Sequence, residues 1–269
     1  MNTNSTNIDH PLINERSMNP IIQVKNLVKK YGDFTAVDNI SFDVYENEIF
    51  GLLGPNGAGK TSTLEVIETL REKTSGEVYV DGMNVENQQG QIKEIIGVQL
   101  QSAGYYPNLN LKQLLELFAG LYNLSIDPMK LLADVNLVDK TKNKFKELSG
   151  GQKQRFSIAT TLINKPKIIF LDEPTTGLDP QARRNLWDLI RNLKKEGCTV
   201  VITTHYMDEA EELCDRIAIV DSGKIIKLDT PNVLIDNLIA SGFVREKKVK
   251  EANLEDVFLN LTGKELRDE

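Results

Sequence analysis

The chain has 269 residues, of which 40% are hydrophobic and 26% are charged, and its formal net charge is −7 at pH 7. This length suits one large α/β domain with a small appendage. The acidic balance argues against a dedicated nucleic-acid binder, so no nucleic-acid partner is expected, and no stretch approaches the roughly 20 consecutive apolar residues of a membrane-spanning helix.

The first part of the chain combines a polar tail with three short strands. Residues 1–20 are rich in Asn, Ser, Thr and Pro and lack the apolar centre of a secretory signal, so they predict a disordered tail. Ile21–Val24 and Ile40–Val44 predict strands of an antiparallel layer. The buried strand Ile49–Leu53 runs into a glycine-rich segment, and a helix is expected from about Lys60 to Leu70.

The middle of the chain departs from this pattern. Glu77–Val80 predicts another strand, which is closed by a turn at Asp81 and Gly82. Apolar residues at helical spacing predict a helix over Leu111–Tyr122, with further short helices after it. We therefore expect residues of about 97–155 to form a helical subdomain.

The last part of the chain alternates between strands and helices. Strands are expected at Lys167–Leu171 and Thr199–Thr203, and helices at Pro180–Lys195 and Met207–Cys214. A hairpin over 217–228 follows. Strands that alternate with helices indicate a mostly parallel sheet with helices on its faces, so the predicted fold class is α/β. The main domain is expected to span 21–230, with a short C-terminal appendage over 231–269.

The glycine-rich segment matches the phosphate-binding pattern G-x-x-x-x-G-K-[ST] in full. Glycines let backbone amides converge on phosphates, and the following helix points its positive end at the same anion. Lys60 is expected to neutralise the β- and γ-phosphates of a nucleotide, and Thr61 to offer an oxygen to Mg²⁺. The predicted nucleotide-binding residues here are Gly54, Pro55, Asn56, Gly57, Ala58, Gly59, Lys60, Thr61 and Ser62.

Two carboxylates end the apolar strand that begins at Lys167. At a strand end, one acid can hold magnesium while its neighbour reaches a water molecule. Asp172 is predicted on the magnesium side, and Glu173 is predicted to position or deprotonate the attacking water. Taken alone, the pair could be solvated acids, but a phosphate-binding loop upstream favours catalysis.

A second anion site is expected where Leu148-Ser149-Gly150-Gly151-Gln152 opens a helix. One nucleotide does not need two such helix starts within one chain, whereas two copies arranged head to tail do. The chain resembles the ATP-binding cassette (ABC) family, whose signature is LSGGQ, over about 21–228. The resemblance implies the P-loop NTPase core of an ABC nucleotide-binding domain. It also implies that Ser149, Gly150, Gly151 and Gln152 contact the nucleotide on the other copy.

The same resemblance implies roles for residues outside these motifs. Tyr31 matches the aromatic residue that stacks on adenine, and His205 matches the histidine that contacts the γ-phosphate. Asp179 lies in the D-loop, which passes between the two cassettes. Each of these residues alone would more readily be structural, and Asp179 before Pro180 is also a good helix N-cap.

Gln101 matches the Q-loop glutamine, which in the family touches magnesium and water and faces the membrane subunit. It is preferred to Gln99 because the family's usual proline follows six residues later, at Pro107. The implied catalytic set is Glu173, His205 and Gln101, and the implied metal ligands are Thr61, Gln101 and Asp172.

The resemblance implies an ATPase that uses ATP and Mg²⁺, pairs with a second nucleotide-binding subunit and serves a separate membrane permease at the cytoplasmic face of the cell membrane. The segment Asn253–Gly263 looks like the tail of ABC-2-type drug and antibiotic exporters, so export of an amphipathic compound is the preferred function. The linker before it is shorter than in many such exporters. Two alternatives stay open: an importer cassette, and a family member that acts on ribosomes or DNA.

Overall fold

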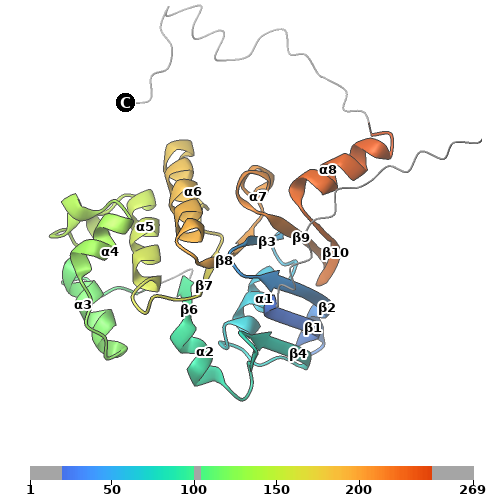
Figure 1. Cartoon of the computed structure of the whole chain (residues 1–269), viewed down its shortest axis with the longest axis horizontal. Helices are drawn as coiled ribbons and strands as arrows, with labels where there is room; N and C mark the ends of the chain where they lie inside the picture. The colour runs from blue at the N-terminus through green and yellow to red at the C-terminus, as the bar shows by residue number, and fades with distance from the viewer. Residues whose placement is uncertain (1–19, 100–103, 244–269) are drawn as a thin grey trace, which may run out of the picture. The chain divides into compact units, whose positions relative to one another are not determined.

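The computed structural model describes residues 20–99 and 104–243 (Figure 1). The chain divides into two compact units, 1–232 and 233–269. Gln101 and the segment Asn253–Gly263 lie outside the described residues, as does the predicted disordered tail except for Pro20, which begins the first strand.

An antiparallel sheet forms the N-terminal layer. It contains β1 (Pro20–Tyr31), β2 (Phe34–Tyr45), β4 (Ser75–Val80) and β5 (Met83–Asn84) in the order β2-β1-β4-β5. β1 and β2 have 12 residues each, many more than the sequence predicts. Their pairing contains several register shifts, which break the apolar alternation by which a strand is recognised in a sequence.

A six-stranded sheet carries the second layer, and all its neighbouring strands are parallel except one antiparallel pair at an edge. Its central strands are wholly buried, which explains their unbroken apolar runs. The strands are β3 (Ile49–Leu53), β6 (Ile96–Gln99), β7 (Ile168–Asp172), β8 (Thr199–Thr204), β9 (Arg216–Asp221) and β10 (Lys224–Asp229). Their order is β10-β9-β3-β8-β7-β6.

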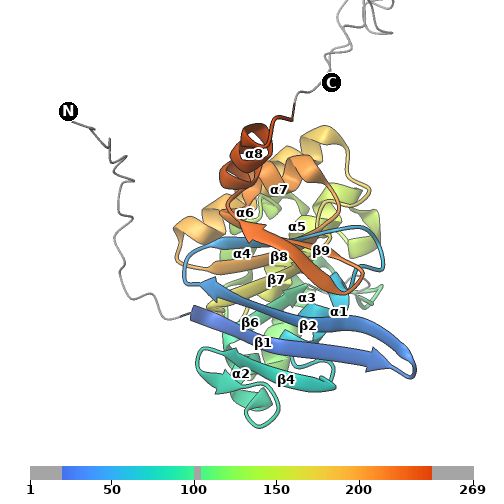
Figure 2. The same ribbon diagram turned by 90° about the vertical axis from the view of Figure 1, so that its right-hand side faces the viewer.

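The helices of the described residues are α1 (Lys60–Ile67), α2 (Gln89–Ile95), α3 (Leu111–Leu121), α4 (Pro128–Asp134), α5 (Gly150–Thr161), α6 (Pro180–Lys195), α7 (Met207–Leu213) and α8 (Pro231–Ala240). Short 3-10 turns lie at Val138–Lys140 and Phe145–Glu147. Figures 1 and 2 show α3, α4 and α5 on the side away from β1, β2 and β4. Within the described ranges, no helix is long and apolar enough to cross a bilayer.

One buried cluster joins the two sheets through α1. Val24 and Val44 contribute from the antiparallel sheet, Leu64 from α1, and Phe50 and Phe170 from the parallel sheet. The rings of Phe42 and Phe50 stack with their centroids 5.3 Å apart, which packs β2 directly against β3. This core fixes the loop between β3 and α1 between the two layers.

The structure corrects two predicted boundaries. Residues 97–99 are not the beginning of the helical block: they belong to β6, which pairs in parallel with β7. β6 is a four-residue edge strand with few apolar side chains, so the sequence gives little signal for it. α1 ends at Ile67 instead of Leu70, because Thr69 adopts a positive φ of 61° that cannot continue a helix.

Candidate active site

The carboxyl ends of three parallel strands bring most of the predicted site residues to one edge of the sheet. In this register Leu53 of β3 lies beside Thr204 of β8, and Thr203 lies beside Asp172 of β7. Because all three strands end here, the glycine-rich loop, the pair of acids and His205 start from neighbouring positions. The fold therefore gathers side chains that are far apart in the sequence.

The glycine-rich loop is pressed against the strands on both sides. A Cβ atom on Gly54 would lie 2.1 Å from the Val220 carbonyl oxygen, and one on Gly59 would lie 2.3 Å from the Ala36 carbonyl oxygen. Gly59 also has a φ of +98°. Side chains at either glycine would push the loop off the sheet.

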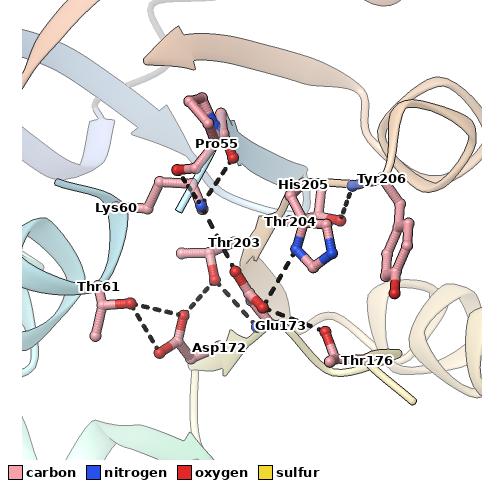
Figure 3. A network of polar contacts seen from close by, with 11 residues as sticks. Pro55, Lys60, Thr61, Asp172, Glu173, Thr176, Thr203, Thr204, His205 and Tyr206 are labelled. Atoms are coloured by element: carbon pink, nitrogen blue, oxygen red, sulfur yellow. Dashed lines mark hydrogen bonds and ion pairs between the residues drawn. The ribbon is translucent and has the colours of Figure 1, made fainter. Parts of the chain in front are cut away.

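The side-chain nitrogen of Lys60 lies under this loop (Figure 3). Its side chain is 4% exposed, and its Nζ donates hydrogen bonds to the carbonyl oxygens of Gly54 at 2.8 Å and Pro55 at 3.0 Å. The same Nζ lies 3.6 Å from Glu173 Oε1. A buried ammonium beside a loop of glycine amides is a suitable receptor for a phosphate group.

Asp172 is surrounded by hydroxyl groups. Thr61 Oγ1 donates to it at 3.1 Å from Oδ2, and the Thr203 hydroxyl donates to Oδ1. These hard oxygen atoms fit Mg²⁺, which proteins often bind with one carboxylate while phosphate and water supply the remaining ligands. Among residues 20–99 and 104–243, no cluster of three or more His, Cys, Asp or Glu side chains could hold a metal ion by itself.

Glu173 occupies the centre of the polar network (Figure 3). Its amide donates to the carbonyl oxygen of Thr203 at 3.2 Å and to the Thr203 hydroxyl at 3.0 Å. Thr176 Oγ1 donates to Oε2 at 3.2 Å, and His205 Nδ1 lies 3.3 Å from the same oxygen. Thr203 and Thr176 were not predicted as site residues, because a threonine at a strand end or in a loop carries no motif signal.

A cleft of about 420 Å³ opens beside the loop. Asn56, Gly57 and residues 59–62 line it, and Glu173, whose side chain is 18% exposed, marks its inner end. Tyr31 and Phe34 of the β1–β2 hairpin form its outer end, where the Tyr31 hydroxyl lies 3.3 Å from Ser62 Oγ. Phe34, which is 63% exposed, was not predicted; its signal is its place directly across the hairpin turn from Tyr31.

The signature and D-loop residues start helices. Ser149 caps α5 by accepting from the Gln152 amide at 3.4 Å, and Gln152 Oε1 accepts from the Ser149 amide at 3.0 Å. Asp179 caps α6 by accepting from the Ala182 amide at 2.8 Å, as its following proline predicts. As far as the chain is described, neither Ser149–Gln152 nor Asp179 lines the cleft of its own chain.

Glu68 places a further carboxyl group near the site. It is 6% exposed. Burial, together with the negative charges of Asp172 and Glu65, raises the pKa of Glu68 to about 8. This group therefore keeps its proton at neutral pH, which limits the negative charge around Asp172.

Comparisons with known proteins find a matching family profile and several similar proteins. The sequence profile of a family described as "ABC transporter" matches residues 37–176. The chain is 34% identical over 299 residues to the Nod factor export ATP-binding protein I of Burkholderia orbicola, covering 92% of this chain and 98% of that protein. It is 38% identical over 223 residues to the linearmycin resistance ATP-binding protein LnrL of Bacillus subtilis, covering 81% and 72%.

Solved structures share the fold. A dimeric ATP-binding cassette, MJ0796, in a post-hydrolysis state bound to ADP and Pi superposes with a TM-score of 0.70 at 29% identity. The match covers 78% of this chain and 98% of that one.

Proposed function

The chain belongs to the ABC transporter family as one of its ATP-hydrolysing cassettes, and from this premise we propose that it powers export of an amphipathic compound through a separate membrane permease. Support for export comes from relatives named for Nod factor export and linearmycin resistance. In this proposal the chain works at the cytoplasmic face of the membrane. The observation that carries the ATPase role is the placement of Glu173 between Lys60 and His205.

Binding of ATP uses the whole length of the cleft. Tyr31, and with it Phe34, stacks on the adenine ring at the outer end. The amides of the glycine-rich loop and Lys60 bind the phosphates at the inner end. Thr61 and Asp172 hold Mg²⁺, which when bound neutralises charge on the phosphate oxygens. Gln101 is proposed as a further ligand from sequence alone.

Hydrolysis requires a water molecule that attacks the γ-phosphorus while the β-phosphate oxygen of ADP leaves. Glu173 accepts the proton of that water as a general base. The Thr176 hydroxyl fixes one oxygen of its carboxylate, and His205 lies beside the same oxygen. From this position His205 helps to orient the Glu173 carboxylate. As the family resemblance implies, it also contacts the γ-phosphate.

A second copy of the cassette closes the site. We place its Ser149–Gln152 turn over the phosphates, since this turn lies at a helix start outside the cleft of its own chain. Asp179 lies at the start of α6 and approaches the second copy in the same arrangement. Two ATP molecules are then bound head to tail between the two chains.

The ATPase assignment is tested with Glu173→Gln. We expect hydrolysis to fall by about 10²–10⁴-fold, because the amide cannot accept the proton, while ATP binding remains. An ATP-dependent dimer should then persist on size-exclusion chromatography. Glu196→Gln, an exposed substitution at the end of α6, is the control. Hydrolysis by Glu173→Gln at the wild-type rate would contradict the role of Glu173.

The export assignment is tested in cells that express the chain together with its membrane subunit. We expect these cells to tolerate linearmycin or another amphipathic antibiotic better than cells with the Glu173→Gln variant. Uptake of a nutrient that depends on an extracytoplasmic binding protein, with unchanged antibiotic tolerance, would favour import instead.

A further inference from the structure

Gln154, one turn into α5, connects the signature helix to the loop that follows Glu173. Its Nε2 donates to the Pro174 carbonyl oxygen at 2.8 Å. A carbonyl oxygen only accepts, so this contact fixes which end of the Gln154 amide faces the loop. Its Oε1 must then face the other way, where it accepts from Gln99 Nε2 at 2.8 Å.

Gln99 secures Gln154 from the side of the parallel sheet. It is the last residue of β6 and is 5% exposed. Gln99 Oε1 is buried and has no hydrogen-bond partner among the described residues. The hydrogen bond from Gln99 Nε2 to Gln154 is therefore what holds the side-chain amide of Gln99 there. Losing this bond would leave a second buried polar atom without a partner, which resists any shift of Gln154.

The start of α5 is also packed tightly against the start of α6. A Cβ atom on Gly151 would lie 2.8 Å from the Ala182 Cβ, and one on Gly150 would lie 3.6 Å from Leu178. Such close packing transmits displacement instead of absorbing it. The Ser149 turn and the segment 174–182, which includes the first turn of α6, therefore move together.

We propose that Gln154 is a positioning residue that couples the two ATP sites of the cassette dimer. The inference rests on the proposed function, in which the Ser149 turn contacts the nucleotide of the other copy while Glu173 acts on the nucleotide of its own chain. Glu173 has a strained φ of 47° and is held on one side by Thr203. Gln154 holds the other side through Pro174, so occupation of one site sets the carboxylate of the other.

The test is the ATP dependence of hydrolysis by the purified full-length chain. Gln154→Leu removes the donor to Pro174. We expect kcat to fall about tenfold, the effect of one hydrogen bond. The Hill coefficient should fall from above 1 to 1, and the Kd for ATP in the P-loop should not change. A merely structural role for Gln154 would not alter the Hill coefficient.

Two further variants sharpen the test. Gln154→Glu keeps the shape of the side chain but cannot donate to a carbonyl oxygen, so it should give the same loss even if the leucine variant folds poorly. Thr160→Val is the control, since it removes a hydrogen bond that stays within α5, from Thr160 Oγ1 to the Ser157 carbonyl oxygen. It should retain the wild-type Hill coefficient.

Three outcomes would overturn the inference. Wild-type hydrolysis with a Hill coefficient of 1 leaves no coupling to explain. If both Gln154 variants keep the wild-type kcat and Hill coefficient while Glu173→Gln still forms an ATP-dependent dimer, the role of Gln154 is refuted and the proposed dimer is not. Failure of Glu173→Gln to dimerise with ATP refutes the proposed dimer and the coupling with it.

Discussion

Glu173 combines an unusual backbone with several polar contacts. A φ of 47° is uncommon for glutamate and costs on the order of 1–3 kcal/mol. Both Thr203 groups that accept from its amide hold the backbone in this conformation. The side chain consequently leaves the line of β7 and reaches the position between Lys60 and His205. The strain thus serves the placement of one carboxylate.

Glu68 makes the stability of the chain depend on pH. Its pKa is about 8 in the folded chain, against an ordinary value of 4.5, so the folded state binds one more proton than the unfolded state between these values. The contribution of Glu68 to the free energy of unfolding is complete below pH 4.5 and is lost as pH rises through about 8. Glu68→Gln removes this titration and should raise the free energy of unfolding at pH 8 by about 2–4 kcal/mol.

The measurement is urea unfolding at pH 4.5, 6 and 8 without nucleotide or magnesium, which would add their own charges. The wild type and Glu68→Gln should agree at the lowest pH and diverge as pH rises. Glu196→Gln, at an exposed position, should follow the wild type throughout. Parallel curves for the wild type and Glu68→Gln would show that Glu68 titrates normally in the folded chain.

At the scale of elements, the contact between α5 and α6 requires a glycine, which has no side chain, at position 151. Gly151→Ala would place its Cβ 2.8 Å from that of Ala182, whereas Gly150→Ala would meet Leu178 at an ordinary 3.6 Å. Both changes give similar helix propensity, so their difference isolates the contact. We expect Gly151→Ala to have a free energy of unfolding about 1–3 kcal/mol lower than that of Gly150→Ala. Urea unfolding at neutral pH measures it, and equal stabilities would contradict the tight packing.

The elements that the sequence predicts well are those with a strong local pattern. β3, β7 and β8 are short, wholly or largely apolar runs, and α6 has regular apolar spacing from Leu186 to Leu193. α2 and β6 were not predicted, because seven polar-rich residues and a four-residue edge strand carry little periodicity. The existence of β6 depends on pairing with β7, which no local window contains.

The site residues fall into the same two groups, those that a local sequence pattern predicts and those that only tertiary contacts bring in. Lys60, Thr61, Asp172 and Glu173 lie in contiguous motifs whose chemistry can be read from residue type and spacing, and the structure brings all four together. Thr203 could not be found from sequence, because its role follows from the register between β7 and β8. Gln154 and Glu68 likewise act through tertiary contacts and burial.

At the scale of the whole molecule, the proposed function divides each ATP site between the cleft beside Lys60 of one chain and the Ser149 turn of another. Among the described residues, those that line the cleft beside Lys60 do not include the Ser149 turn of the same chain. A symmetric head-to-tail pair would complete both sites at once, since each surface then meets its complement. Such a shared site predicts a result on mixing two variants that a site formed by one chain would not give.

Two inactive variants should restore activity when mixed. Lys60→Ala removes the phosphate ligand from the P-loop, and Ser149→Arg blocks the signature turn, so each homodimer has two defective sites. In a mixed dimer, the intact Lys60 of one chain faces the intact Ser149 of the other, which leaves one complete site. Random mixing in equal amounts makes half of the dimers mixed, so recovery should reach at most about a quarter of wild-type ATPase activity.

The control places both substitutions in one chain. When the double variant is mixed with the wild type, each mixed dimer has two incomplete sites. In one of them an intact Lys60 faces a blocked signature turn, and in the other an intact Ser149 turn faces a P-loop without the lysine ammonium. The activity of this mixture should therefore come from wild-type homodimers alone. Activity that fails to return on mixing the two single variants, although both form dimers with the wild type, would mean that each chain closes its own site.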